Sequence, residues 1–142
     1  MDFWVVAYNL VLCAIMKVPL NILKYKPQTA KVRPWSEIEQ HYVDLNNHGW
    51  QLDPLLHLVR HIITTKLSDR LFAFTSMNKL VIGIYDPMEW NREALHIEFD
   101  GQTQKWFFKY HPKPNEPIEF ERKYSADKGI EKFDNFIKMM KW

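Results

Sequence analysis

The sequence predicts an α+β fold, in which a mostly antiparallel sheet of about five strands is framed by helices. The sheet is expected between residues 71 and 124, where short alternating segments rich in aromatic residues are broken by turn residues. Apolar residues at helical spacing occur both before and after this stretch. We therefore expect two helices, then the sheet, then one C-terminal helix packed on it.

Helix signals bound the two helices that precede the sheet. Ser36 and Glu39 have the spacing of a capping box, which predicts that the first helix begins at Ser36. Gly49 closes this helix at a position suited to a left-handed backbone conformation. An Asp-Pro pair at residues 53–54 begins the second helix, which runs to about residue 66.

The first two strands are predicted at residues 71–75 and 79–85, and Asn78 in the turn between them can adopt a positive φ. The second strand is apolar on both of its faces, which is typical of a strand covered on both sides. The helices can cover one face of the sheet. An apolar N-terminal segment, residues 3–16, is the nearest candidate to cover the other face.

Residues 94–99 and 105–110 form the clearest hairpin, with Asp100-Gly101 at its tip. A loop of two or four residues places the apolar residues of both strands on one face, whereas a three-residue loop would expose one apolar row. The expected buried row consists of Leu95, Ile97, Phe99, Trp106, Phe108 and Tyr110. With the four-residue loop, Glu98 lies opposite Lys105 on the outer face.

A proline-rich connection at residues 111–117 leads to the last strand, residues 118–124, after which Ser125 caps the final helix. An apolar stripe at helical spacing should hold that helix against the sheet, and it consists of Ile130, Phe133, Ile137 and Met140.

These patterns divide the chain into an apolar N-terminal segment at residues 1–23, a basic arm or linker at residues 24–35, and one α+β domain at residues 36–142. Residues 3–16 carry no charge, but the run is shorter than the roughly 20 apolar residues of a membrane span. We expect this segment to pack on the domain. The alternatives are a membrane anchor, since basic residues follow the run, and a true start at Met16.

Composition narrows the function classes. A formal net charge of +2 is too small to indicate a polyanion as partner, and four glycines argue against a glycine-rich phosphate loop. The single cysteine, Cys13, excludes an intrachain disulfide and fits a reducing, cytoplasmic setting. The sequence holds no nucleophile elbow, Walker loop or dinucleotide fingerprint, and we expect no cofactor.

A histidine pair is the first candidate site. His57 and His61 lie one helical turn apart and can present two imidazoles on one face, which is a common arrangement for binding a metal. Arg60 between them opposes a cation, and the glutamate of a zinc peptidase helix is missing. A solvated polar helix face explains the pair equally simply.

Two further candidates lie on the predicted strands. Glu121 and Lys123 have the spacing in which a carboxylate binds a metal and a lysine orients the nucleophile of a nuclease. Residues 105–110 interleave lysines with aromatics, as in strands on which single-stranded nucleic acids stack. Both patterns also suit an ordinary strand with an outer polar row.

By elimination, the sequence favours a small non-catalytic interaction module that binds a protein partner or forms a homodimer. The candidate interaction surface consists of Trp90, Phe107, Lys109 and Lys113. The alternative is a metal-dependent hydrolase or nuclease that uses the histidine pair or the Glu-x-Lys triplet. An enzyme should gather those residues in a concave pocket with perturbed ionisation, whereas a binding module should show a flat aromatic patch.

Overall fold

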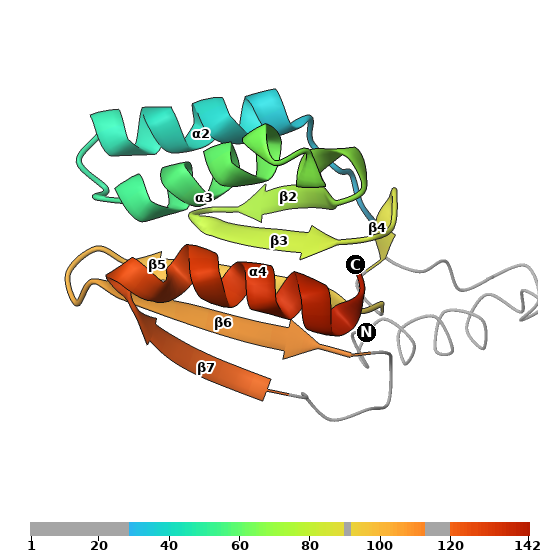
Figure 1. The fold of residues 1–142 in the computed structure, drawn as a ribbon. Helices are drawn as coiled ribbons and strands as arrows, with labels where there is room; N and C mark the ends of the chain where they lie inside the picture. Colours follow the sequence, from blue (N-terminus) through green and yellow to red (C-terminus); the bar gives the residue numbers. More distant parts are fainter. Residues whose placement is uncertain (1–28, 90–91, 113–119) are drawn as a thin grey trace, which may run out of the picture.

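The predicted sheet is present in the computed structural model, which describes residues 29–89, 92–112 and 120–142. Five antiparallel strands lie in the order β2-β3-β5-β6-β7 (Figure 1). Their bounds are β2 Phe72–Ser76, β3 Lys79–Gly83, β5 Ala94–Asp100, β6 Lys105–His111 and β7 Phe120–Ser125. Strands that follow one another in this sheet are neighbours in space, as local hairpin connections dictate.

Three helices pack on one face of this sheet (Figure 1). They are α2 (Trp35–Asn47), α3 (Asp53–Thr64) and α4 (Gly129–Met140), and two short 3₁₀ helices, η2 (Leu67–Asp69) and η3 (Ala126–Lys128), flank them. The helix α4 lies over β5 and β6, and α3 runs beside it. The fold is therefore α+β with two layers, as the sequence predicts.

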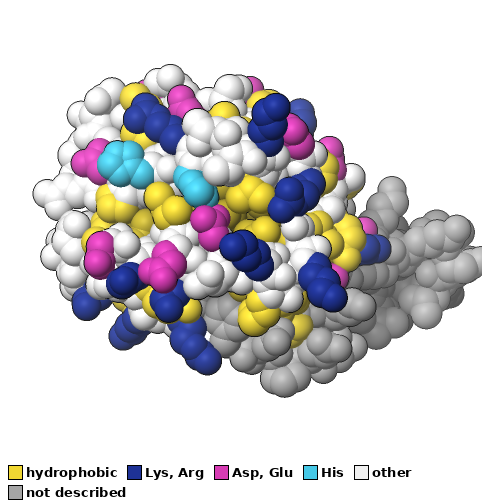
Figure 2. Space-filling model, in the orientation of Figure 1, with side chains coloured by type: hydrophobic (Ala, Val, Ile, Leu, Met, Phe, Trp, Pro, Cys, Tyr) yellow, Lys and Arg dark blue, Asp and Glu magenta, His cyan; other side chains and the backbone are white. Residues whose placement is uncertain are grey.

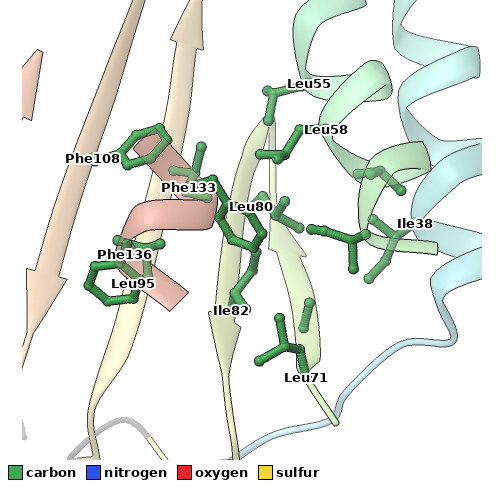
Figure 3. Packing of buried hydrophobic residues seen from close by; sticks show 14 of the residues in the cluster. Ile38, Leu55, Leu58, Leu71, Leu80, Ile82, Leu95, Phe108, Phe133 and Phe136 are labelled. Carbon is green, nitrogen blue, oxygen red and sulfur yellow. The ribbon is translucent and has the colours of Figure 1, made fainter. Parts of the chain in front are cut away.

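The main core fills the space between these two layers (Figure 3). Leu80, Ile97 and Phe108 lie side by side across β3, β5 and β6, and none is more than 1% exposed. Leu55 and Leu58 of α3 and the aromatic residues of α4 close over this row (Figure 3). Full burial of each such side chain contributes about 1.5–3 kcal/mol to folding.

The β5–β6 hairpin confirms the predicted buried row and a four-residue loop, residues 101–104, but not the predicted pairing of Glu98. Asp100 pairs with Lys105 and Glu98 pairs with Phe107, so the pairing of Glu98 with Lys105 is wrong. Strand β5 extends to Asp100, one residue beyond the predicted end, and Asp100 bonds to the turn that follows. Its carboxylate accepts a bond from the Gln102 amide at 2.9 Å, and its carbonyl accepts one from the Gln104 amide at 2.8 Å. The shift by two residues keeps every side chain on its predicted face.

Three local expectations about turns and caps have different outcomes. Gly49 has a φ of +88°, which confirms the left-handed position after α2. The helix α2 begins one residue early, behind Pro34, and no side chain caps it, so the predicted capping box is wrong. In the β2–β3 turn the positive φ belongs to Met77, at 56°, and not to Asn78.

Two side chains of α2 form hydrogen bonds with the β2–β3 turn, which contains Met77 and Asn78. His41 Nε2 donates a hydrogen bond to the Met77 carbonyl at 2.8 Å, and the Tyr42 hydroxyl donates one to the Asn78 carbonyl at 3.1 Å. Burial raises the pKa of Tyr42, so this hydroxyl keeps its proton. The two bonds help to impose a backbone conformation that the sequence alone does not favour at a methionine.

A two-stranded ribbon lies against the opposite face of the sheet. It pairs β1 (Thr29–Ala30) with β4 (Met88–Glu89). Beneath it a second, smaller apolar cluster is buried, and its members are Phe74, Val81, Met88 and Ala94, with Ala30 and Val32 packed at its side. Part of the second face is thus covered by residues 29–32, and the expectation for residues 3–16 lies outside the described residues.

The surface on the helix side carries interspersed charges. Figure 2 shows it in the orientation of Figure 1, with lysines, arginines, acidic residues and hydrophobic atoms mixed over the helices. Such a mixture is typical of a solvated surface. None of the helices within the described ranges is long and apolar enough to cross a membrane.

Candidate binding groove on the open face of the sheet

A hollow of about 800 Å³ lies on the sheet face that the helices leave free. Strand alternation builds it, because the residues next to the buried row must point to the other face. Val81, His96, Lys109 and Glu121 lie directly across from one another on β3, β5, β6 and β7, and all four line the hollow. We call this hollow the open-face groove.

The floor of the groove is apolar at its β3 end. Val81, Met88 and Ala94 line it and are at most 6% exposed, because the smaller core cluster lies there. Gly83 belongs to the same region, since a Cβ on this glycine would meet the Met88 side chain at 2.7 Å. The floor is therefore tightly packed, and the small part of these side chains that lines the hollow is apolar.

Two histidines lie at the centre of the groove. The rings of His96 and His111 meet edge to face, with centroids 4.3 Å apart. Burial lowers the pKa of His96 to about 3, and positive charge at His111, Lys79 and Lys109 acts in the same direction. Burial also lowers the pKa of His111, helped by the two lysines. Both imidazoles are consequently neutral near pH 7.

Charged side chains surround this histidine pair. Lys109 Nζ lies 3.1 Å from Glu121 Oε1, and Lys123 Nζ lies 5.4 Å from the centroid of the Phe107 ring. Five lysines and arginines and three glutamates line the groove within the described residues, so its charge is positive while the histidines are neutral. The excess is small and local, which differs from the extended basic stripe of a nucleic-acid interface.

A second, shallower hollow of about 640 Å³ adjoins the groove. The two share Glu98 and Phe107, and the second extends to the loop after α2, where Trp50 is 48% exposed. Gly101 fits here because a Cβ would press on the backbone of the same loop at 3.0–3.1 Å. The face thus continues from the histidine pair past Phe107 to an exposed indole.

The structure gathers four of the residues that the sequence singled out. Phe107 and Lys109 of the candidate interaction surface lie in the groove with Glu121 and Lys123 of the candidate nuclease triplet. The other two members of the interaction surface, Trp90 and Lys113, lie outside the described residues. The groove is concave and holds Glu121 and Lys123, as the enzyme alternative predicts, but the perturbed ionisation belongs to His96 and His111, which that alternative did not name.

The candidate metal pair lies elsewhere, on α3. His57 is exposed, whereas His61 Nε2 donates a hydrogen bond to Asp134 Oδ1 of α4 at 2.8 Å. His61 therefore has a structural role that the sequence did not reveal, as a link between two helices. Across the described part of the chain, no three His, Cys, Asp or Glu side chains gather closely enough to hold a metal ion.

The sequence reasoning missed His96, His111, Lys79 and Trp50. The alternation of β5 and β6 already indicates that His96 and His111 face away from the buried row. Their proximity depends on the register of β5 against β6, and the predicted pairing of Glu98 was two residues in error. The exposure of Trp50 depends on how its loop packs. Only the outward direction of the two histidines could have been found beforehand.

Comparison with protein-family models, with curated proteins and with solved structures found no match for this chain. The class of protein is therefore defined by the fold and the groove alone. It is an α+β domain whose antiparallel sheet is covered by helices on one face and hollowed on the other.

Proposed function

We propose that this protein is a small, non-catalytic, cytoplasmic module that binds a segment of a protein partner in the open-face groove. The observation that supports this most strongly is the groove itself, in which an apolar floor passes directly into a rim of charged groups. Concave sites with apolar walls and a few converging polar groups are the usual form of a binding site. The cytoplasmic setting rests on the lone Cys13.

Two aromatic side chains at the rim support a peptide-sized ligand. Phe107 is half-buried under Lys123, and Trp50 is exposed at the far end of the adjoining hollow. Aromatic anchors within polar surroundings often supply much of the energy of a protein interface. A segment that extends from the histidine pair to Trp50 would contact both.

The rival proposal, a metal-dependent nuclease, is favoured by one observation, namely that Glu121 and Lys123 lie in the groove. Both side chains already have partners, because Glu121 binds Lys109 and Lys123 lies over the Phe107 ring. Glu121 is also well exposed, at 64% of its side chain, which is a poor setting for a tightly held metal. We therefore rank this proposal second.

The test uses the full chain as bait in its native cell, followed by a titration with the purified captured protein. We expect Phe107→Ser and Trp50→Ser to weaken binding by roughly tenfold or more. Met139→Ser is the matched control, since Met139 is 60% exposed on α4, on the helix side. Equal affinities for all four proteins would overturn the proposal. Metal-dependent nucleic-acid cleavage that is lost in Glu121→Gln would establish the rival one.

A further inference from the structure

Among the described residues, the β3 side of the groove centre carries a positive charge that no neighbouring carboxylate neutralises. Lys79 begins β3 and is half-buried at the groove wall, and within the described residues no carboxylate lies within ion-pair distance of it. Lys109 shares its charge with Glu121, which is on the far side of β6 from β5. A ligand carboxylate could therefore pair with Lys79 without displacing a carboxylate of the described residues.

The neutral histidine pair lies beside this local excess of positive charge. Among the described residues, the permanent charges that act on His96 belong to Lys79 and Lys109, and both are positive. A carboxylate acts on His111, where Glu121 offsets part of the same effect. The β3 side of the groove centre is therefore the place where a ligand anion would gain most.

The apolar floor lies next to this positive centre. Val81 is the direct cross-strand neighbour of His96, and Met88 and Ala94 continue the floor. From this juxtaposition we infer that the bound segment is an acidic peptide. It places a carboxylate between Lys79 and His96 and an adjacent apolar side chain on the floor. This inference rests on the proposed function and names the chemistry of the partner.

The same groove disfavours a polyanion. Glu98 and Glu121 lie on either side of Phe107 and Lys109, and Glu89 stands at the β4 end. A phosphate chain running along the groove would meet these carboxylates in turn, whereas a single carboxylate meets only the positive centre. Charge complementarity therefore favours an isolated acid within an apolar sequence.

The test selects ligands for the full chain from a displayed library of random short peptides. We expect the selected peptides to share Asp or Glu next to a large apolar residue. Their affinity should fall roughly tenfold or more in Lys79→Gln, since a charge-assisted bond is lost. Lys138→Gln is the matched control, because Lys138 is exposed near the end of α4. Selection with Lys79→Glu should enrich Lys or Arg in place of the acid.

The outcomes separate the inference from the function on which it rests. The inference alone would be overturned if the selected peptides bind the Phe107→Ser protein more weakly but share no acidic residue. It would also be overturned if they bind the Lys79→Gln protein as tightly as the natural protein. If neither substitution changes the affinity of the selected peptides, the proposed function is overturned too. If a mixed-sequence single-stranded oligonucleotide binds the natural protein but not the Lys79→Gln protein, the ligand is a nucleic acid and not a peptide. If the chain forms a dimer and the Lys79→Gln protein does not, the occupant of the groove is a second copy of the chain and not a peptide.

Discussion

Gly129 begins α4 directly against the indole of Trp106. A Cβ on this glycine would overlap three atoms of that ring, although its φ of −59° is ordinary helical backbone. Trp106 cannot retreat, because it is 1% exposed and its Nε1 donates a hydrogen bond to the Ala126 carbonyl at 3.0 Å. Close approach of helix and sheet therefore requires glycine at residue 129.

We predict that Gly129→Ala lowers the free energy of unfolding by about 1–3 kcal/mol through overpacking. In an open helix the same change would instead stabilise by about 1 kcal/mol, so the sign identifies the contact. Urea unfolding followed by circular dichroism measures it. Asn135→Ala, at an exposed position of the same helix, should change stability by less than about 0.5 kcal/mol. If Gly129→Ala instead raises the free energy of unfolding, the Trp106 ring can move to make room for the added methyl group.

His96 makes stability depend on pH in a direction that its surroundings determine. Its pKa is about 3 in the folded protein and near 6.5 in the unfolded chain, so between these values the unfolded chain binds more protons. The free energy of unfolding therefore falls as the pH falls from about 6.5 towards 3, by up to about 1.4 kcal/mol per unit. The lowered pKa of His111 adds to the same slope, and Glu121 opposes part of it.

We predict that His96→Gln flattens this acidic slope. Urea midpoints measured at intervals between about pH 4 and pH 7 should fall less steeply in the variant than in the natural protein. His57→Gln removes an exposed histidine of α3 and should leave the slope as it is. If the three slopes coincide, folding does not lower the pKa of His96.

At the scale of elements, periodicity was sufficient to place the three helices and the five strands of the main sheet, because each buries at least one apolar face. The two-residue strands β1 and β4 were not predicted. The stripe of α4 shows the limit. Phe133 and Ile137 are buried as expected, and Phe136, which the stripe omits, is also buried because it contacts Tyr110 and Trp142. Caps and pairing were harder to predict. They depend on single hydrogen bonds, such as that of Asp100 with Gln102, which leave no periodic signal.

The groove could be predicted only in part for the same reason. Alternation predicts which residues leave the core, and on that basis Phe107 was expected to face outward. Which outward residues meet depends on register, on the β1–β4 ribbon and on the loop that exposes Trp50. The approach of His96 to His111 is thus a tertiary property that composition and spacing do not contain.

We predict that α4 is held to the sheet mainly by its aromatic side chains. Phe133 is fully buried in the main core, so Phe133→Ala should lower the free energy of unfolding by about 3–5 kcal/mol. Met139 lies on the same helix at 60% exposure, and Met139→Ala should cost less than about 0.5 kcal/mol. Chemical unfolding of both variants measures the difference. Similar losses would show that α4 is bound through its outer face as well.

At the scale of the whole molecule, the two faces of the sheet differ in how they are covered. Three helices bury one face, whereas a short ribbon covers part of the other and leaves the groove. Within the described residues, every buried member of the main core lies between Ile38 and Trp142. The smaller cluster adds only Ala30 and Val32 from the chain before α2. Among the described residues, the apolar contacts of both clusters thus begin at Ala30.

We predict that a chain lacking residues 1–28 still folds. Its urea transition should stay cooperative, since both clusters retain the described members between Ala30 and Trp142. Circular dichroism and urea unfolding of the two proteins provide the comparison. Loss of the cooperative transition would show that the fold requires residues 1–28, as expected if residues 3–16 pack on the domain. In that case the same segment would compete with the acidic peptide for the groove, and the full chain would bind such a peptide more weakly than the groove alone allows.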